Sequence, residues 1–110
     1  ADIRDRDGGL DAVAGISHMP HLAAFALLHS QKDCIKNSKD IIGTGFKSMT
    51  RIGASGEDVW AGILYANKEQ VIKQAQRYRK EIERAEKMLK AGKVMPYIKA
   101  ARLLRESLDK

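Results

Sequence analysis

The sequence predicts an all-α protein made of a single domain, and three observations support this prediction. The chain has 110 residues, which allows one compact domain with its own core. It contains only two prolines and 5% aromatic residues, and apolar residues seldom alternate with polar ones. The hydrophobic fraction of 44% and the charged fraction of 31% are typical of a soluble folded protein. We therefore expect one helical domain over residues 1–110 and no strands.

The net charge limits the classes of partner that we expect, and the cysteine content indicates the cellular compartment. Twenty Lys and Arg against fourteen Asp and Glu give a net charge of +6, which favours anionic partners such as nucleic acid, a membrane surface or an acidic metabolite. Nucleic acid is disfavoured because acidic residues interleave with the basic ones and no aromatic residues cluster beside them. The single cysteine, Cys34, cannot form an intrachain disulfide, so we expect a structural thiol and a cytoplasmic protein.

The first helix is expected over residues 10–30, with Pro20 inside it. Proline removes a backbone donor and clashes with the carbonyl four residues earlier, which predicts a kink or break over residues 16–19. Residues 22–28 are apolar on every side, a pattern typical of a helix enclosed by others.

Although residues 12–31 lack Asp, Glu, Lys and Arg, three histidines and the proline disfavour a membrane span. Residues 1–7 do not form a secretory signal, and because the chain begins without Met we expect a fragment.

Two short helices are expected next. The first covers residues 31–42 and ends at Gly43, and the second covers residues 46–54 after a Gly-Thr-Gly break. The Ser55 hydroxyl is then expected to cap a new helix whose first turn carries acidic residues.

That new helix is predicted to be long, from about residue 57 to residue 91, with Gly92 at its end. A helix of 35 residues measures ~52 Å, whereas a compact domain of this size is only ~34 Å across, so part of the helix should contact another chain. Its apolar stripe advances in steps of three and four, as in helix packing: Trp60, Ile63, Leu64, Asn67, Val71, Ala75, Tyr78, Ile82, Ala85 and Leu89. A last helix begins at Met95-Pro96 and can pack back on the long one.

The pentapeptide SHMPH at residues 17–21 is the most unusual part of the sequence. It places His18 and His21 on one face of a helix, beside a proline that frees backbone groups. Three interpretations are open, namely a metal site, two histidines satisfied inside a helix core, or a pair that binds substrate. A metal site is disfavoured because no further ligand stands at a recognised spacing.

Two other polar residues each have two interpretations. Arg51 lies in a short segment flanked by glycines, where it can either cap a helix end or give a carboxylate two parallel hydrogen bonds. Asn67 interrupts the apolar stripe, where it can either set the register between helices or bond a neighbouring loop. Gly43-Thr44-Gly45 lacks the third glycine and the preceding strand of a dinucleotide loop, so no nucleotide site is expected.

Taken in order, these motifs resemble one family. SHMPH at residues 17–21, MTRIGAS at residues 49–55, then Trp60 and Asn67 are similar to the helical C-terminal domain of prephenate and arogenate dehydrogenases. The resemblance implies a helical dimerisation domain of the 6-phosphogluconate dehydrogenase C-terminal-like kind. It also implies an N-terminal Rossmann domain, absent from these residues, that binds NAD or NADP and supplies the catalytic histidine. Trp60, Asn67, Val71, Tyr78 and Ile82 are expected in helix packing or dimer contacts.

The resemblance also assigns three substrate-binding residues. His18 and His21 match the two histidines of the S-H-x-P-H motif, and Arg51 matches the arginine that holds a substrate carboxylate. Many members carry an acid where Ser48 stands and another where Gly62 stands, so a gating ion pair that uses the first acid is not carried over. No catalytic, cofactor or metal residue is assigned within the chain.

The expected function is therefore part of a prephenate dehydrogenase. The resemblance implies oxidative decarboxylation of prephenate to 4-hydroxyphenylpyruvate with NAD(P), in tyrosine biosynthesis, by a cytoplasmic homodimer that uses prephenate or arogenate. The 110 residues alone are expected to be inactive. The alternative is a stand-alone helical dimerisation or interaction module whose basic surface binds a protein or nucleic acid.

Overall fold

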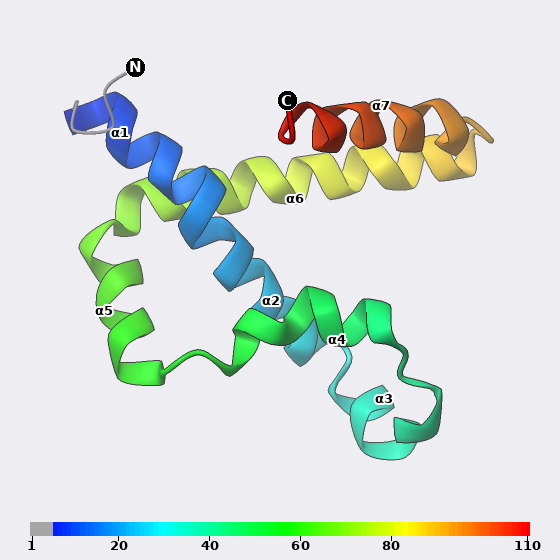
Figure 1. The fold of residues 1–110 in the computed structure, drawn as a ribbon, viewed down its shortest axis with the longest axis horizontal. Helices are drawn as coiled ribbons and strands as arrows, with labels where there is room; N and C mark the ends of the chain where they lie inside the picture. Colours follow the sequence, from blue (N-terminus) through cyan, green and yellow to red (C-terminus); the bar gives the residue numbers. More distant parts are fainter. Residues whose placement is uncertain (1–5) are drawn as a thin grey trace. The chain divides into compact units, whose positions relative to one another are not determined.

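The computed structural model describes residues 6–110, and every regular element in that range is a helix (Figure 1). The all-α prediction is confirmed. In chain order the elements are α1 (Arg6–Val13), the π-helical turn η1 (Ala14–His18), α2 (Met19–Ser30), α3 (Lys32–Asn37), the 3₁₀ turn η2 (Lys39–Ile41), α4 (Thr44–Thr50), the 3₁₀ turn η3 (Arg51–Ala54), α5 (Glu57–Ala66), α6 (Lys68–Lys90) and α7 (Val94–Ser107). The chain divides into two compact units, one ending at Gln74 and the other running from Ala75 to Lys110.

In the first unit, α1, η1 and α2 follow one another without a loop. The irregularity predicted over residues 16–19 is present, but as the π-helical turn η1 rather than as a break. In this turn the Met19 N–H donates to the Ala14 carbonyl, five residues back. The wider turn accommodates Pro20, which has no N–H to offer the carbonyl of Ile16. The helix therefore continues from Arg6 to Ser30 through the proline.

The core of this unit is small. Its buried apolar residues are Ala14, Met19, Ala24 and Val71. The prediction that residues 22–28 are enclosed on every side is wrong for this chain, because only Ala24 is buried there and Ala26 is exposed. The reason is that α4 and η3 pack against α2 and leave part of its surface uncovered.

Close packing of η3 on α2 depends on Gly53. A Cβ atom at Gly53 would overlap Cδ1 of Leu28 and lie 3.8 Å from the Cβ of Ala24. Just before η3, the buried Thr50 hydroxyl donates to the Phe46 carbonyl at 2.7 Å, which closes the last turn of α4. The absence of a side chain at Gly53 therefore lets the segment that carries Arg51 lie directly against α2.

The prediction of one long helix over residues 57–91 is wrong. The helix is interrupted at Asn67, so α5 ends before this residue and α6 begins after it. Asn67 has φ −119° and ψ 32°, outside the α-helical region, and its carbonyl accepts the Val71 N–H at 3.0 Å as α6 begins. The predicted cap is also wrong, since Gly56 occupies the N-cap position of α5 and the Ser55 hydroxyl donates to the Ile52 carbonyl instead.

The second unit is a helical hairpin made by the C-terminal part of α6 and by α7 (Figure 1), as the sequence predicted. Gly92 turns the chain with φ 72°, a left-handed conformation that glycine adopts without strain, and the Lys93 N–H donates to the Met88 carbonyl at 2.8 Å. Tyr97 joins the two helices, because its hydroxyl donates to Glu81 at 2.5 Å while the Arg84 guanidinium lies 4.9 Å from its ring centroid.

The hairpin leaves many apolar side chains exposed. They are Tyr78, Ile82, Leu89, Met95, Ile98, Leu103, Leu104 and Leu108. Within residues 6–110, no helix is both long enough and apolar enough to cross a membrane.

The close approach at Gly53 predicts a stability effect. We expect Gly53→Val to lower the free energy of unfolding by about 1–3 kcal/mol, because the new side chain must displace Leu28 or move η3 away from α2. Gly62→Val is the matched control, since Gly62 lies in α5 and a Cβ added there would meet no atom within 4 Å outside its own stretch of helix, and it should change stability by less than ~0.5 kcal/mol. Chemical denaturation measures both variants, and equal effects would contradict this account.

Candidate functional site

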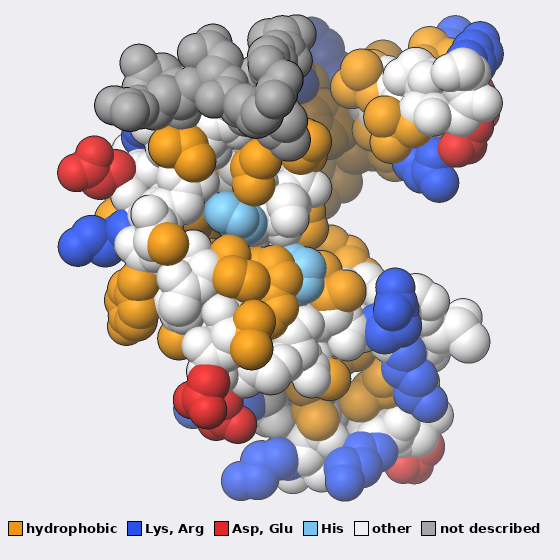
Figure 2. All heavy atoms as spheres, turned by 60° about the vertical axis from the view of Figure 1, so that its left-hand side comes forward, with side chains coloured by type: hydrophobic (Ala, Val, Ile, Leu, Met, Phe, Trp, Pro, Cys, Tyr) orange, Lys and Arg blue, Asp and Glu red, His pale blue; other side chains and the backbone are white. Residues whose placement is uncertain are grey.

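The two histidines of SHMPH lie at the junction between η1 and α2. His18 ends the π-helical turn, and His21 lies in the first turn of α2. Nδ1 of His21 is 3.1 Å from the carbonyl oxygen of Ser17. Both rings are partly exposed, and Figure 2 shows histidine side chains at the surface among hydrophobic ones. The pair is therefore accessible from solvent, and the structure does not bury it in a helix core.

Trp60 of α5 packs against both imidazoles. Its ring stacks on His21 with centroids 3.5 Å apart and planes 15° apart. It meets His18 edge to face, at 6.3 Å and 83°. Stacking of this kind fixes ring orientation and supplies a flat apolar surface. The sequence assigned Trp60 to helix packing and dimer contacts, and in this structure its neighbours include the predicted substrate-binding histidines.

Asn67 completes the group, and we call His18, His21, Trp60 and Asn67 the imidazole cluster. The Asn67 side chain is only 7% exposed. Its amide nitrogen donates to the Leu10 carbonyl at 3.0 Å and lies 3.4 Å from Nδ1 of His18. Of the two roles expected for Asn67, the structure shows the hydrogen-bonding one, with a helix rather than a loop as its partner. The sequence assigned Trp60 and Asn67 to packing or dimer contacts. Their place in the same ordered set of motifs as SHMPH was a signal that could have indicated this proximity.

The surroundings of His18 favour its neutral form. Burial lowers the pKa of His18 below its ordinary value, and the nearby charge of His21 lowers it further. Since the ordinary pKa is about 6.5 and the shift is downward, the neutral form of His18 is favoured at neutral pH. A neutral imidazole has one donor nitrogen and one acceptor nitrogen, so this ring can act in directional hydrogen bonding.

Arg51 lies apart from these contacts. It is exposed at the start of η3, and the structure shows no hydrogen bond or ion pair joining its guanidinium to the described side chains. The structure thus brings His18 and His21 together with Trp60 and Asn67, while Arg51 is exposed outside this group. Of the remaining residues expected in packing or dimer contacts, Val71 is buried, whereas Tyr78 and Ile82 are exposed on the hairpin.

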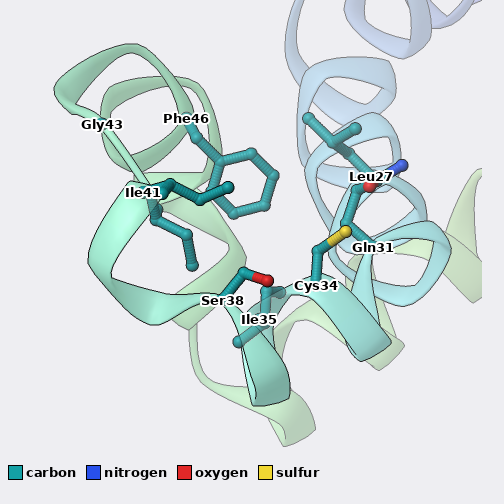
Figure 3. A pocket seen from close by; sticks show the side chains of 9 residues that line it. Leu27, Gln31, Cys34, Ile35, Ser38, Ile41, Gly43 and Phe46 are labelled. Atoms are coloured by element: carbon teal, nitrogen blue, oxygen red, sulfur yellow. The ribbon is translucent and has the colours of Figure 1, made fainter.

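A hollow of about 330 Å³, separate from the imidazole cluster, lies at the C-terminal end of α2 (Figure 3). Figure 3 shows Leu27, Ile41 and Phe46 facing it from three different elements. Cys34 lines this hollow with an exposed thiol, whereas the sequence predicted a structural one.

Among residues 6–110, no group of three or more His, Cys, Asp or Glu side chains could hold a metal ion.

Comparison with known proteins identifies the family of this fold and motif set. The family described as "Prephenate dehydrogenase, dimerization domain" matches residues 10–105. The chain belongs to this family. The resemblance of its motifs is thereby confirmed, and residues 10–105 cover most of both compact units of the chain.

Individual relatives agree with this assignment. A Bacillus subtilis (strain 168) prephenate dehydrogenase is 28% identical over 99 residues, which cover 84% of this chain and 27% of that protein. A Lactococcus lactis subsp. cremoris (strain MG1363) prephenate dehydrogenase is 29% identical over 77 residues, which cover 66% of this chain and 22% of that protein. The chain therefore spans about a quarter of the length of these curated relatives.

Two solved structures share the fold. Prephenate dehydrogenase from A. aeolicus, in complex with hydroxyphenyl propionate and NAD+, matches with a TM-score of 0.79 and 25% identity, over 93% of this chain and 38% of that one. Synechocystis arogenate dehydrogenase matches with a TM-score of 0.69 and 22% identity, over 93% of this chain and 37% of that one, which supports the fold alone.

The lowered pKa of His18 predicts a pH dependence of stability. Because the folded state binds the His18 proton more weakly, the unfolded state holds more protons just below the ordinary pKa of about 6.5. The stability that neutral His18 contributes is thus complete above about pH 6.5 and falls as the pH drops through the range just below it. Denaturant titrations give the free energy of unfolding at each pH for the wild type and for His18→Gln. The loss of stability caused by protonation of His18 should appear in the wild type only. An identical pH dependence in both proteins would contradict the prediction.

Proposed function

We propose that this chain forms part of the substrate site and the dimer contact of a prephenate dehydrogenase. The whole enzyme would oxidatively decarboxylate prephenate or arogenate with NAD(P), a step of tyrosine biosynthesis. The observation that carries the proposal is the imidazole cluster, in which residues of the motif set form one group whose two imidazoles are partly exposed. Family membership supports the same reaction class.

The chemistry of the cluster suits an anion that carries a six-membered ring. Prephenate has two carboxylates, and a guanidinium can bind one of them with two parallel hydrogen bonds, a role that Arg51 would perform. The ring nitrogens of His18 and His21 offer further hydrogen bonds, while Trp60 offers a flat apolar surface. The net charge of +6 attracts a dianion. The A. aeolicus relative was solved with hydroxyphenyl propionate, a ligand that likewise joins a ring to a carboxylate.

The nicotinamide cofactor does not fit the described residues. No strand precedes Gly43 and Gly45 within residues 6–110, so these glycines do not form the strand, loop and helix that hold a dinucleotide. We assign cofactor binding and the catalytic histidine to a Rossmann domain outside these residues. The role of this chain is then to bind and orient the substrate, and alone it would not catalyse the reaction.

Arg51 provides the direct test of substrate binding. In the full-length protein we expect Arg51→Ala to raise the KM for prephenate by roughly ten- to a hundredfold, because a charge-assisted hydrogen bond contributes ~1.5–3 kcal/mol. Arg51→Lys should recover only part of the loss, since an ammonium lacks the planar fork of a guanidinium. His21→Ala should also raise this KM.

The KM for the cofactor is the internal control and should not change in these variants. All values are corrected for the folded fraction of each variant. An unchanged KM for prephenate in Arg51→Ala, combined with a lower melting temperature, would remove Arg51 from the site and leave it a structural role.

Dimer formation is proposed for the exposed apolar surface of the hairpin. Tyr78 is 40% exposed and Ile82 is 47% exposed, and they lie four residues apart on one face of α6. An exposed surface of this kind is typical of a protein interface, and the family is described as a dimerization domain. A two-fold dimer would cover this face with the same face of a second chain.

A charge introduced on this apolar face tests the dimer. We expect Ile82→Glu to raise the dimer dissociation constant by roughly tenfold or more, because a buried carboxylate would face an apolar partner. Lys80→Glu places the same side chain on α6 outside the apolar stripe, and it should leave the dimer intact. Sedimentation equilibrium measures both variants, and a monomeric wild type across micromolar concentrations would refute the dimer.

A further inference from the structure

The side-chain amide of Asn67 has only one orientation that satisfies its neighbours. Its nitrogen, rather than its oxygen, must face the Leu10 carbonyl 3.0 Å away, because a carbonyl oxygen can only accept a hydrogen bond. Asn67 is 7% exposed, so solvent offers little alternative to this bond. The backbone of α1 therefore determines which end of the amide points toward His18.

The same NH₂ group decides which nitrogen of His18 carries the proton. It lies 3.4 Å from Nδ1 of His18, and an amide NH₂ can only donate. Nδ1 must then be the unprotonated nitrogen, so the proton of the neutral ring is on Nε2. Protonation of Nδ1 would place two N–H groups against each other, and this repulsion acts in the same direction as the burial that already lowers the pKa of His18.

His21 has the opposite arrangement. Its Nδ1 lies 3.1 Å from the Ser17 carbonyl, which can only accept, so Nδ1 carries the proton in the neutral ring. Nε2 of His21 is then an acceptor. Two histidines three residues apart thus carry their protons on different ring nitrogens, each set by a different backbone carbonyl.

We propose that Asn67 is a positioning residue that holds His18 in its Nε2–H form, so that the histidine pair offers one donor and one acceptor. Such a pair selects a ligand that combines an oxygen acceptor, such as a carboxylate, with a hydroxyl donor. The use of the pair in binding rests on the proposed function, whereas the positions of the protons rest on the hydrogen bonds alone. The titratable group that faces His18 is His21 of α2, while α5 contributes the nonionising Trp60 and α1 contributes the Leu10 backbone.

Nitrogen NMR of the protein labelled with [¹⁵N]histidine tests the proposal, because the shifts of the two ring nitrogens show which one carries the proton. Signals are assigned by their loss in His18→Gln and His21→Gln. Above neutral pH we expect the Nε2–H form for His18 and the Nδ1–H form for His21. A wild-type spectrum with the Nδ1–H form at His18 would overturn the proposal without any variant of Asn67.

Substitution of Asn67 separates positioning from mere packing. In Asn67→Asp a carboxylate replaces the donor and can accept from Nδ1–H, so His18 should change to the Nδ1–H form and its pKa should rise by roughly one unit or more. In Asn67→Ala neither form is held, and a mixture is expected. The exposed His29, also on α2, is the control whose signals should not change. Folded variants in which His18 keeps the wild-type form and pKa would show that Asn67 does not position it.

Titration with prephenate distinguishes this inference from the proposed function. Binding that shifts the His18 Nε2 and His21 Nε2 signals supports both. No binding by the full-length protein would refute the proposed function but leave the proton assignment intact. Binding that leaves both histidine spectra unchanged would overturn the use of the pair as a donor and an acceptor, while the substrate assignment would stand.

Discussion

The hydrogen bond from Asn67 to the Leu10 carbonyl connects residues 57 positions apart, and the arrangement of the first unit depends on it. It ties the junction between α5 and α6 to α1, at the point where the chain leaves one helix and begins the next. With the junction held there, Trp60, two turns earlier in α5, reaches the imidazoles at the start of α2. About two turns into α6, Gln74 makes a second connection, since its amide donates to the Asp11 carboxylate at 2.9 Å and packs beside Gly15. Both amide side chains are buried and hydrogen-bonded. Each hydrogen bond therefore specifies which groups of α1 must lie beside it, as well as adding a contact.

Local features of the structure could be predicted from the sequence. Proline chemistry located the irregularity before Pro20, and the glycine at residue 92 located the turn of the hairpin. The histidine pair was identified by its residue types and spacing. The irregularity before Pro20 and the turn at Gly92 are confirmed, because each depends on interactions within a few residues of the chain.

Features that depend on distant partners could not be predicted from periodicity. The stripe from Trp60 to Leu89 continues across Asn67 in helical steps, so nothing local indicates that the helix ends there. The break is specified by a carbonyl in α1, which a helical repeat cannot reveal. For the same reason Trp60 was read as an ordinary packing residue. Its contact with His21 required knowing that the chain turns at Asn67 and returns toward α2.

The stacking of Trp60 on His21 also determines what the tryptophan fluorescence of the chain can detect. Trp60 is the single tryptophan among these 110 residues, so the indole emission of the chain originates inside the imidazole cluster. A ligand that enters the cluster, or a proton that charges the stacked ring, changes the surroundings of that one fluorophore directly. The domain thus carries an intrinsic probe at its own candidate binding site, with no other indole in these residues to dilute the signal.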